Sequence, residues 1–154
     1  MKLGKKVLSI VLCMMLSVVT LAGCGGGSKT TSGDAKDKKL ITVGFSQVGA
    51  ESDWRTANSE SMKSTFSEAN GYELIFDDAQ QKQENQITAI RNFIQQEVDY
   101  IVLAPVTESG WDAVLQEAKD AKIPVIIVDR MVKVSDDSLY TAWVGSNFEL
   151  EGQK

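Results

Sequence analysis

The segment DYIVLAPVTESGWDAVLQEAKDAKIPVIIVDR, residues 99–130, decides the fold class of this chain. Its two ends, DYIVLAPV and PVIIVDR, are short apolar runs typical of buried strands. Between them Val114, Leu115 and Ala118 recur at helical spacing, and Ser109-Gly110-Trp111-Asp112 has the capping-box pattern of a helix start. A strand, a helix and a strand in this order predict a right-handed crossover between parallel strands.

Three further apolar runs extend this pattern: LITVGFS, YELIFDD and LYTAWVGS. The residues between the first two strands follow helical spacing up to Asn70-Gly71: Ala57, Met62, Thr65, Phe66 and Ala69. A second helix is expected in KQENQITAIRNFIQQEV, with Ile87, Ile90, Ile94 and Val98 on one face and Phe93 at its edge. The predicted fold class is α/β, a doubly wound, mostly parallel five-stranded sheet.

The amino-terminal segment has the layout of an export signal. Three lysines in MKLGKK precede the apolar run VLSIVLCMMLSVVTLAG. The run ends in Leu21-Ala22-Gly23-Cys24, which resembles the lipobox of bacterial lipoproteins and predicts lipid on Cys24. We therefore expect a signal peptide at residues 1–23 and, from its Gly, Ser, Thr and Lys content, a flexible tether at 24–39.

Composition excludes several kinds of chemistry. The sequence has no histidine and two cysteines, of which Cys13 lies in the segment expected to be removed. Histidine-dependent catalysis, thiolate nucleophiles, disulfides and metal sites built on these residues are therefore not expected in the folded part. Removing the three signal lysines lowers the net charge from −5 to −8. So acidic a chain is not expected to bind nucleic acid, because phosphate contacts need clustered cations.

The carboxyl-terminal end again carries a helix-start pattern, Ser146-Asn147-Phe148-Glu149, with Ser146 or Asn147 as the cap. The sequence stops at Lys154. We interpret this as a fragment cut early in a helix; the alternative is a frayed terminal turn.

Ligands of open α/β sheets bind beyond the carboxyl ends of the strands. The segments expected there are QVGAESDWR, DDAQQ, APVTES, DR and GSN. They lack the closely spaced glycines of a phosphate cradle, and their carboxylates, amides, arginines and indole suit a neutral polyol. Asp129-Arg130 is the strongest pair for adjacent hydroxyl groups; the alternative is an ordinary surface ion pair or turn.

The aromatic and charged residues also have structural readings. We expect Trp54 to pack at a helix start rather than to act as a platform for the ligand. The simple alternative for Arg55 beside it is a solvated side chain. Trp111 is expected to be half-buried and Trp143 to lie in the core. The run DDAQQKQEN is interpreted as mainly solvated, with Asp78 and Gln80 within reach of the cleft.

The lipobox together with ITVGFSQVGAESDWR, DDAQQKQENQITAIRNFI, the segment 98–130 and VGSN resembles the sugar-binding proteins of ABC importers in the ribose-binding, or type I periplasmic binding protein, family. The resemblance implies a two-lobed protein whose first lobe spans residues 40–147. The start of a second-lobe helix would lie at 148–154, after a hinge crossing at VGSN. By position, the implied sugar contacts are Glu51, Ser52, Trp54, Arg55, Asp129 and Arg130. Asp53 lies in the same turn, where the family has a small residue, and is included among the candidates.

The implied function is capture of a monosaccharide, galactofuranose-like or ribose-like, for an ABC importer permease. The protein would be a monomer, lipid-anchored to the outside of the cell membrane, without catalytic residues, cofactor or metal. One alternative is a sensor of the same fold that signals to a membrane kinase or chemoreceptor. An enzyme, such as a glycosidase or a flavodoxin-like electron carrier, is disfavoured by the missing histidines and phosphate loop. A repressor of the lac-repressor family would need a helix-turn-helix in place of the signal peptide.

Overall fold

A computed structural model describes residues 39–147, 150 and 152–153 of the chain. The predicted signal peptide, the lipidation site Cys24 and nearly all of the predicted tether lie outside the described residues, as do Phe148 and Glu149 of the predicted terminal helix. Asn147 Oδ1 accepts a hydrogen bond from the Leu150 N–H at 3.1 Å, which is the contact expected of a helix cap.

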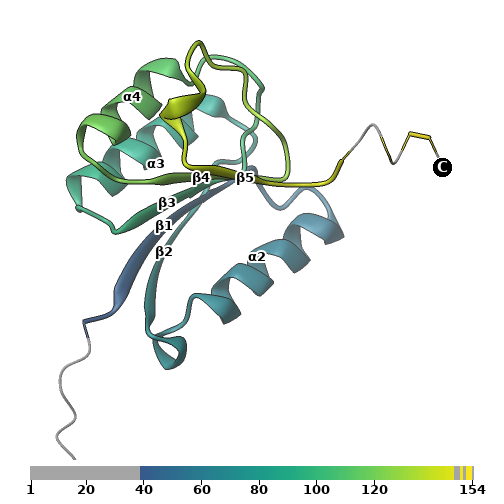
Figure 1. Ribbon diagram of the computed structural model, residues 1–154. Helices are drawn as coiled ribbons and strands as arrows, with labels where there is room; N and C mark the ends of the chain where they lie inside the picture. The colour runs from purple at the N-terminus through teal and green to yellow at the C-terminus, as the bar shows by residue number, and fades with distance from the viewer. Residues whose placement is uncertain (1–38, 148–149, 151, 154) are drawn as a thin grey trace, which may run out of the picture. The chain divides into compact units, whose positions relative to one another are not determined.

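The fold is a parallel five-stranded sheet with helices on both faces, which confirms the predicted fold class (Figure 1). The strands are β1 (Ile41–Gln47), β2 (Tyr72–Asp78), β3 (Tyr100–Leu103), β4 (Val125–Val128) and β5 (Ala142–Val144). Their order across the sheet is β2-β1-β3-β4-β5. β2 lies on one side of β1, and β3, β4 and β5 follow on the other side. This change in the order of strand addition creates a topological switch point at the carboxyl ends of β1 and β3.

Helices α3 (Gln83–Gln95) and α4 (Asp112–Asp120) cover one face, and α2 (Asp53–Thr65) lies on the other (Figure 1). The α3 and α4 face holds the larger apolar core, which contains Ile90, Phe93, Trp111 and Leu115. Phe93 is only 2% exposed and belongs to the centre of this core, so its prediction as an edge residue was wrong. Gly44 in β1 allows the Phe93 ring of α3 to lie directly against the strand, because a β-carbon at Gly44 would overlap that ring.

The inward face of α2 differs from the predicted one. Ala57, Thr65 and Ala69 are exposed, whereas Arg55 and Ser59 are buried. The helix ends at Thr65, followed by a short 3-10 turn, η1 (Glu68–Asn70), and Gly71 with a left-handed φ of 89°. Met62 and Phe66 pack against the core as predicted. Apolar periodicity missed the rest of the inward face because its first half is polar.

Three further expectations about single residues were wrong. Ser109 does not cap α4, because the residue before the helix is Trp111. Trp111 was expected to be half-buried but is fully buried, and it donates its indole N–H to the Thr107 carbonyl at 2.9 Å. Trp143 is 37% exposed rather than in the core, because β5 is an edge strand. A second 3-10 turn, η2 (Asp137–Leu139), leads into β5.

A buried glutamine joins the carboxyl ends of β1 and β3. Gln86 is fully buried on α3, and its Nε2 donates to the carbonyls of Ala104 at 2.7 Å and Ser46 at 3.4 Å. Its Oε1 accepts from the Val106 N–H at 2.8 Å. Since both loops leave the sheet here, this amide sets the spacing of two strand-end segments.

We expect Gln86→Leu, which keeps the side-chain volume, to lower the free energy of unfolding by about 2 to 4 kcal/mol, because buried backbone groups lose their partners. Urea unfolding measures this. Thr88→Ala on the exposed face of the same helix is the control, with an expected change within about 0.5 kcal/mol. A loss in Gln86→Leu no larger than that of the control would contradict the assigned role.

A carboxylate in β2 is expected to make stability depend on pH. Burial, and secondarily the charge of Asp78, raises the pKa of Asp77 above its usual value. Asp77 Oδ1 is buried without a hydrogen-bond partner among the described residues. Because the folded state binds this proton more tightly than the unfolded state, Asp77 destabilises the fold as pH rises through the raised pKa.

Asp77→Asn is therefore expected to raise the melting temperature at pH 7, and the gain should shrink as pH falls towards about 4, where the unfolded-state carboxyl also protonates. Thermal unfolding across this pH range measures it. Glu73→Gln, at an exposed carboxylate of the same strand, should change little. A pH-independent gain for Asp77→Asn would rule out titration of this carboxyl as the cause.

Candidate functional site

The turn after β1 is built around a buried arginine. Ser52 caps α2, and its Oγ accepts a hydrogen bond from the Arg55 N–H at 3.2 Å. This cap fixes the first turn of the helix. The turn directs the Arg55 side chain inward, where only 5% of it is exposed, which corrects the reading of Arg55 as a solvated residue.

Two carboxylates hold the Arg55 guanidinium. Its Nε donates to Glu51 Oε1 at 3.1 Å and its Nη2 to Asp129 Oδ2 at 2.7 Å. Charge-assisted hydrogen bonds of this kind offset the cost of burying a charge. Arg55 Nη1 is also buried, and no described residue accepts from it. We call Glu51, Arg55 and Asp129 the Arg55 cluster.

Asp129 reaches this cluster from the end of β4 in an unusual backbone conformation. Its φ is 65°, in the left-handed region, which Asp and Asn tolerate better than most residues do. The carboxylate is therefore presented from a turn that immediately follows the strand. The sequence identified Asp129 as a candidate but not its partner, which is Arg55 of the first turn, 74 positions away.

Arg130 does not join the Arg55 cluster through any hydrogen bond in the described part of the chain. It is exposed, and its Nη1 donates to the Val106 carbonyl at 3.4 Å. Arg130 thus lies against the loop that follows β3. Asp129 and Arg130 are neighbours at the carboxyl edge of the sheet, but they do not form the ion pair that was considered as an alternative.

The remaining candidates of the first turn are exposed. Trp54 is 55% exposed, so the prediction that it packs at the helix start was wrong. The Arg55 guanidinium carbon lies over the Trp54 ring, 4.8 Å from its centroid, as in a cation–π contact, and more than half of Trp54 stays exposed. Asp53 is the first residue of α2, where a negative charge is favourable to the helix dipole.

A second buried glutamine was missed by the sequence analysis. Gln47 is fully buried at the end of β1, and its Nε2 donates to Asn58 Oδ1 at 2.8 Å and Ser59 Oγ at 3.2 Å. Its Oε1 accepts from the Val48 N–H at 2.9 Å. Gln47 therefore ties α2 to the strand end and so positions Arg55. The available signal was a polar side chain directly after a run of buried strand residues.

The acidic loop after β2 is used mainly for its own structure. Asp78 Oδ1 accepts from the Gln80 N–H at 2.8 Å, and Gln80 and Gln81 both have left-handed φ angles. The Gln81 N–H donates to the Val48 carbonyl at 2.7 Å, so this loop braces the turn after β1.

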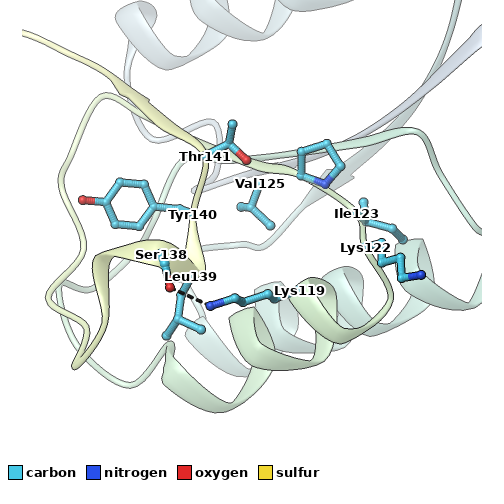
Figure 2. Close-up of a pocket in the computed structure, with 9 residues that line it drawn as sticks. Lys119, Lys122, Ile123, Val125, Ser138, Leu139, Tyr140 and Thr141 are labelled. Atoms are coloured by element: carbon cyan, nitrogen blue, oxygen red, sulfur yellow. Dashed lines mark hydrogen bonds between the residues drawn. The ribbon is translucent and has the colours of Figure 1, made fainter.

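A surface pocket with a cavity volume of about 210 Å³ lies at the other edge of the sheet (Figure 2). Its lining includes Pro124 and Val125, where β4 begins, and Thr141, just before β5. Lys119 Nζ donates to Ser138 Oγ at 2.6 Å across it. None of its lining residues has a buried polar side-chain atom without a partner, whereas Arg55 does. The Arg55 cluster at the carboxyl edge is therefore the better candidate site.

The described residues limit the other possibilities. They contain no group of three side chains able to hold a metal ion. Within the same part of the chain, no helix combines the length and apolarity needed to span a bilayer.

Comparison with known proteins adds a family. Residues 43–154 match the family described as periplasmic binding protein domain. The galactofuranose-binding protein YtfQ of Escherichia coli is 53% identical over 113 residues, which cover 73% of this chain and 35% of that protein.

Two solved structures are similarly close. The periplasmic binding protein component of the arabinose ABC transporter from Shewanella sp. ANA-3, bound to α- and β-L-arabinofuranose, is 60% identical with a TM-score of 0.71 and covers 73% of this chain and 37% of that chain. A Mycobacterium smegmatis protein in complex with β-D-fucofuranose is 57% identical with a TM-score of 0.70, covering 73% and 37%. The chain thus matches little more than a third of the length of these relatives.

The Arg55 cluster is expected to contribute to stability. Asp129→Asn keeps tolerance of the left-handed φ but removes a charge from a buried pair, and should lower the free energy of unfolding by about 1 to 3 kcal/mol. Glu117→Gln is the matched control, because Arg91 and Glu117 form an exposed pair with the same 2.7 Å separation. Its expected loss is below about 1 kcal/mol. Equal losses in urea unfolding would show that burial adds nothing.

Proposed function

The chain belongs to the periplasmic binding protein domain family, and on that premise we propose that it forms the first lobe of a solute-binding protein that captures a furanose sugar for an ABC importer. The observation that carries the proposal is the Arg55 cluster, which places a buried guanidinium between two carboxylates at the carboxyl edge of a parallel sheet. The named ligands of the similar proteins, galactofuranose, arabinofuranose and fucofuranose, support a furanose over a pyranose.

The chemistry of the cluster suits neighbouring hydroxyl groups. Arg55 Nη1 is a buried donor without an acceptor in the described residues, so a sugar oxygen would satisfy it. Each carboxylate uses one oxygen on Arg55, which leaves the second oxygen of Glu51 and of Asp129 to accept from hydroxyl groups. The exposed face of Trp54 would pack on the C–H face of the ring.

The other candidates take supporting roles in this proposal. Arg130 is exposed beside the Val106 carbonyl and would donate to a hydroxyl on the far side of the sugar. Ser52 acts through the helix cap, with its oxygen already accepting from Arg55. Asp53 would act at the rim, where its exposed carboxylate changes the charge that an entering sugar meets.

Capture would proceed by closure of two lobes. In this proposal residues 40–147 form the first lobe, and the second begins at 148–154 after a hinge at VGSN, residues 144–147. A sugar shifts the open and closed populations only by its preference for the closed state. Contacts from both lobes are therefore needed, and the first lobe alone should bind weakly. The closed form would present its surface to the permease.

We place the protein outside the cell membrane as a monomer, held there by lipid on Cys24 and a tether up to residue 39. The proposal rests on the lipobox pattern of the sequence.

The relatives are binding proteins rather than enzymes, and the chain has no histidine. We therefore assign binding without catalysis.

A thermal-shift panel on the protein at its natural length tests the function. L-arabinose, D-galactose and D-fucose should raise the melting temperature, since a ligand at about 100 times its Kd adds about 2.7 kcal/mol of stability. 5-Deoxy-L-arabinose, which closes only as a furanose, should keep the shift. 4-Deoxy-L-arabinose, which closes only as a pyranose, should lose it. A shift with amino acids or peptides and none with sugars would refute sugar capture.

Two substitutions connect the shift to the proposed residues. Trp54→Ala and Arg130→Ala should each abolish the sugar-induced shift, because each removes a proposed sugar contact. Since both side chains are exposed, the melting temperature of the free protein should stay within a few degrees. Tyr100→Ala is the control, because Tyr100 is an exposed aromatic residue at the opposite end of the sheet. Retention of the full shift in both cleft variants would remove these residues from the site.

A further inference from the structure

We propose that Trp143 is a positioning residue of the binding site, which holds the Asp129 backbone so that its carboxylate reaches both Arg55 and the sugar. The proposal rests on the function proposed above and adds a residue in β5 that does not itself belong to the Arg55 cluster. Trp143 was expected to be a core residue, and its contacts instead point to a local task.

The side chain of Trp143 makes one polar contact with the described residues. Its indole Nε1 donates to the Asp129 carbonyl oxygen at 3.1 Å. The Asp129 N–H in turn donates to the Val144 carbonyl at 2.9 Å. The backbone C=O and N–H of Asp129 are thus held by two consecutive residues of β5, Trp143 and Val144. The Asp129 carboxylate is held by Arg55 at 2.7 Å.

Such holding is needed because Asp129 adopts a φ of 65°. This region is disfavoured for residues with a β-carbon and persists only where surrounding contacts impose it. If the backbone relaxed out of this conformation, the carboxylate would leave the direction that joins it to Arg55. The indole N–H is one of the contacts that prevent relaxation.

Gly145 supplies independent support for this arrangement. A β-carbon at Gly145 would overlap the Asp129 carbonyl oxygen and the Trp143 ring together. The backbone at Gly145 therefore lies so close to the hydrogen bond between Trp143 and Asp129 that only glycine fits there. Gly145→Ala should displace the indole from Asp129 and reproduce the effect of removing its N–H.

Two measurements on the protein at its natural length test the proposal. Trp143→Phe keeps an aromatic ring and removes the donor. Its affinity for L-arabinose, measured by calorimetry, should fall about five- to tenfold, which corresponds to one lost hydrogen bond. Without sugar, amide hydrogen exchange at Asp129 should accelerate about fivefold or more, while the melting temperature changes by no more than a few degrees. Gly145→Ala should show the same faster exchange at Asp129, and this measurement is made without sugar because Gly145 also lies in the proposed hinge.

Tyr140→Phe is the control, because it removes one hydroxyl group from an aromatic residue just before the same strand, at the opposite end of the sheet. It should alter neither measurement. Unchanged exchange at Asp129 in Trp143→Phe would overturn the proposal, and so would unchanged affinity in a variant of a protein that binds L-arabinose. If the unsubstituted protein bound no sugar, the proposed function would fail separately, and the exchange measurement would still decide whether Trp143 holds Asp129.

Discussion

The structure at the carboxyl edge of the sheet depends on the buried charge of Arg55. A guanidinium is a cation with hydrogen-bond donors and no acceptor, so burying one requires acceptors close by. Glu51 supplies one from the preceding turn and Asp129 supplies the other from the end of β4. These two ion pairs therefore fix where α2 begins relative to β4. They explain why the inward face of α2 opens with Arg55, and the hydrogen bond from Gln47 explains why Ser59 follows on that face. The face becomes apolar only at Met62, before Phe66 at the end of the helix.

Stability and presentation of the site are divided between the apolar core and the strand ends. The apolar core under α3 and α4 is built from fully buried side chains such as Phe93, Leu115 and Ile127. The strand ends are joined by amides, because Gln86 links β1 to β3 and Gln47 links β1 to α2. Burial of apolar area is not directional, whereas hydrogen bonds are. The carboxyl edge therefore gains defined orientations of its loops from a small number of buried polar groups, and the core beneath carries most of the stabilisation.

The sequence predicted the sheet well because its strands are short apolar runs separated by helices, a pattern that depends on local composition. It also brought the residues of the first turn and Asp129 to one edge, since parallel strands end together. The partner of Asp129 was beyond reach, because the contact with Arg55 joins distant segments and depends on the rotation of α2. That rotation follows polar bonds from Gln47 to Asn58 and Ser59, and hydrophobic periodicity cannot detect these. The prediction that Trp143 lies in the core was wrong for a related reason. The apolar composition of its segment suits a core strand, but β5 lies at the edge of the sheet.

The Arg55 cluster is only partly saturated, and this bears on how a sugar would bind. Each carboxylate gives one oxygen to the guanidinium, and Nη1 of Arg55 keeps a donor without an acceptor in the described residues. On the proposed function, hydroxyl groups would complete this network without breaking its ion pairs. Closure of a second lobe would then exclude water and strengthen the same pairs, because electrostatic interactions grow as the effective dielectric constant falls. The contacts that hold the free lobe together would thus also favour the closed, sugar-bound state, provided that Asp129 keeps the backbone conformation from which it reaches Arg55.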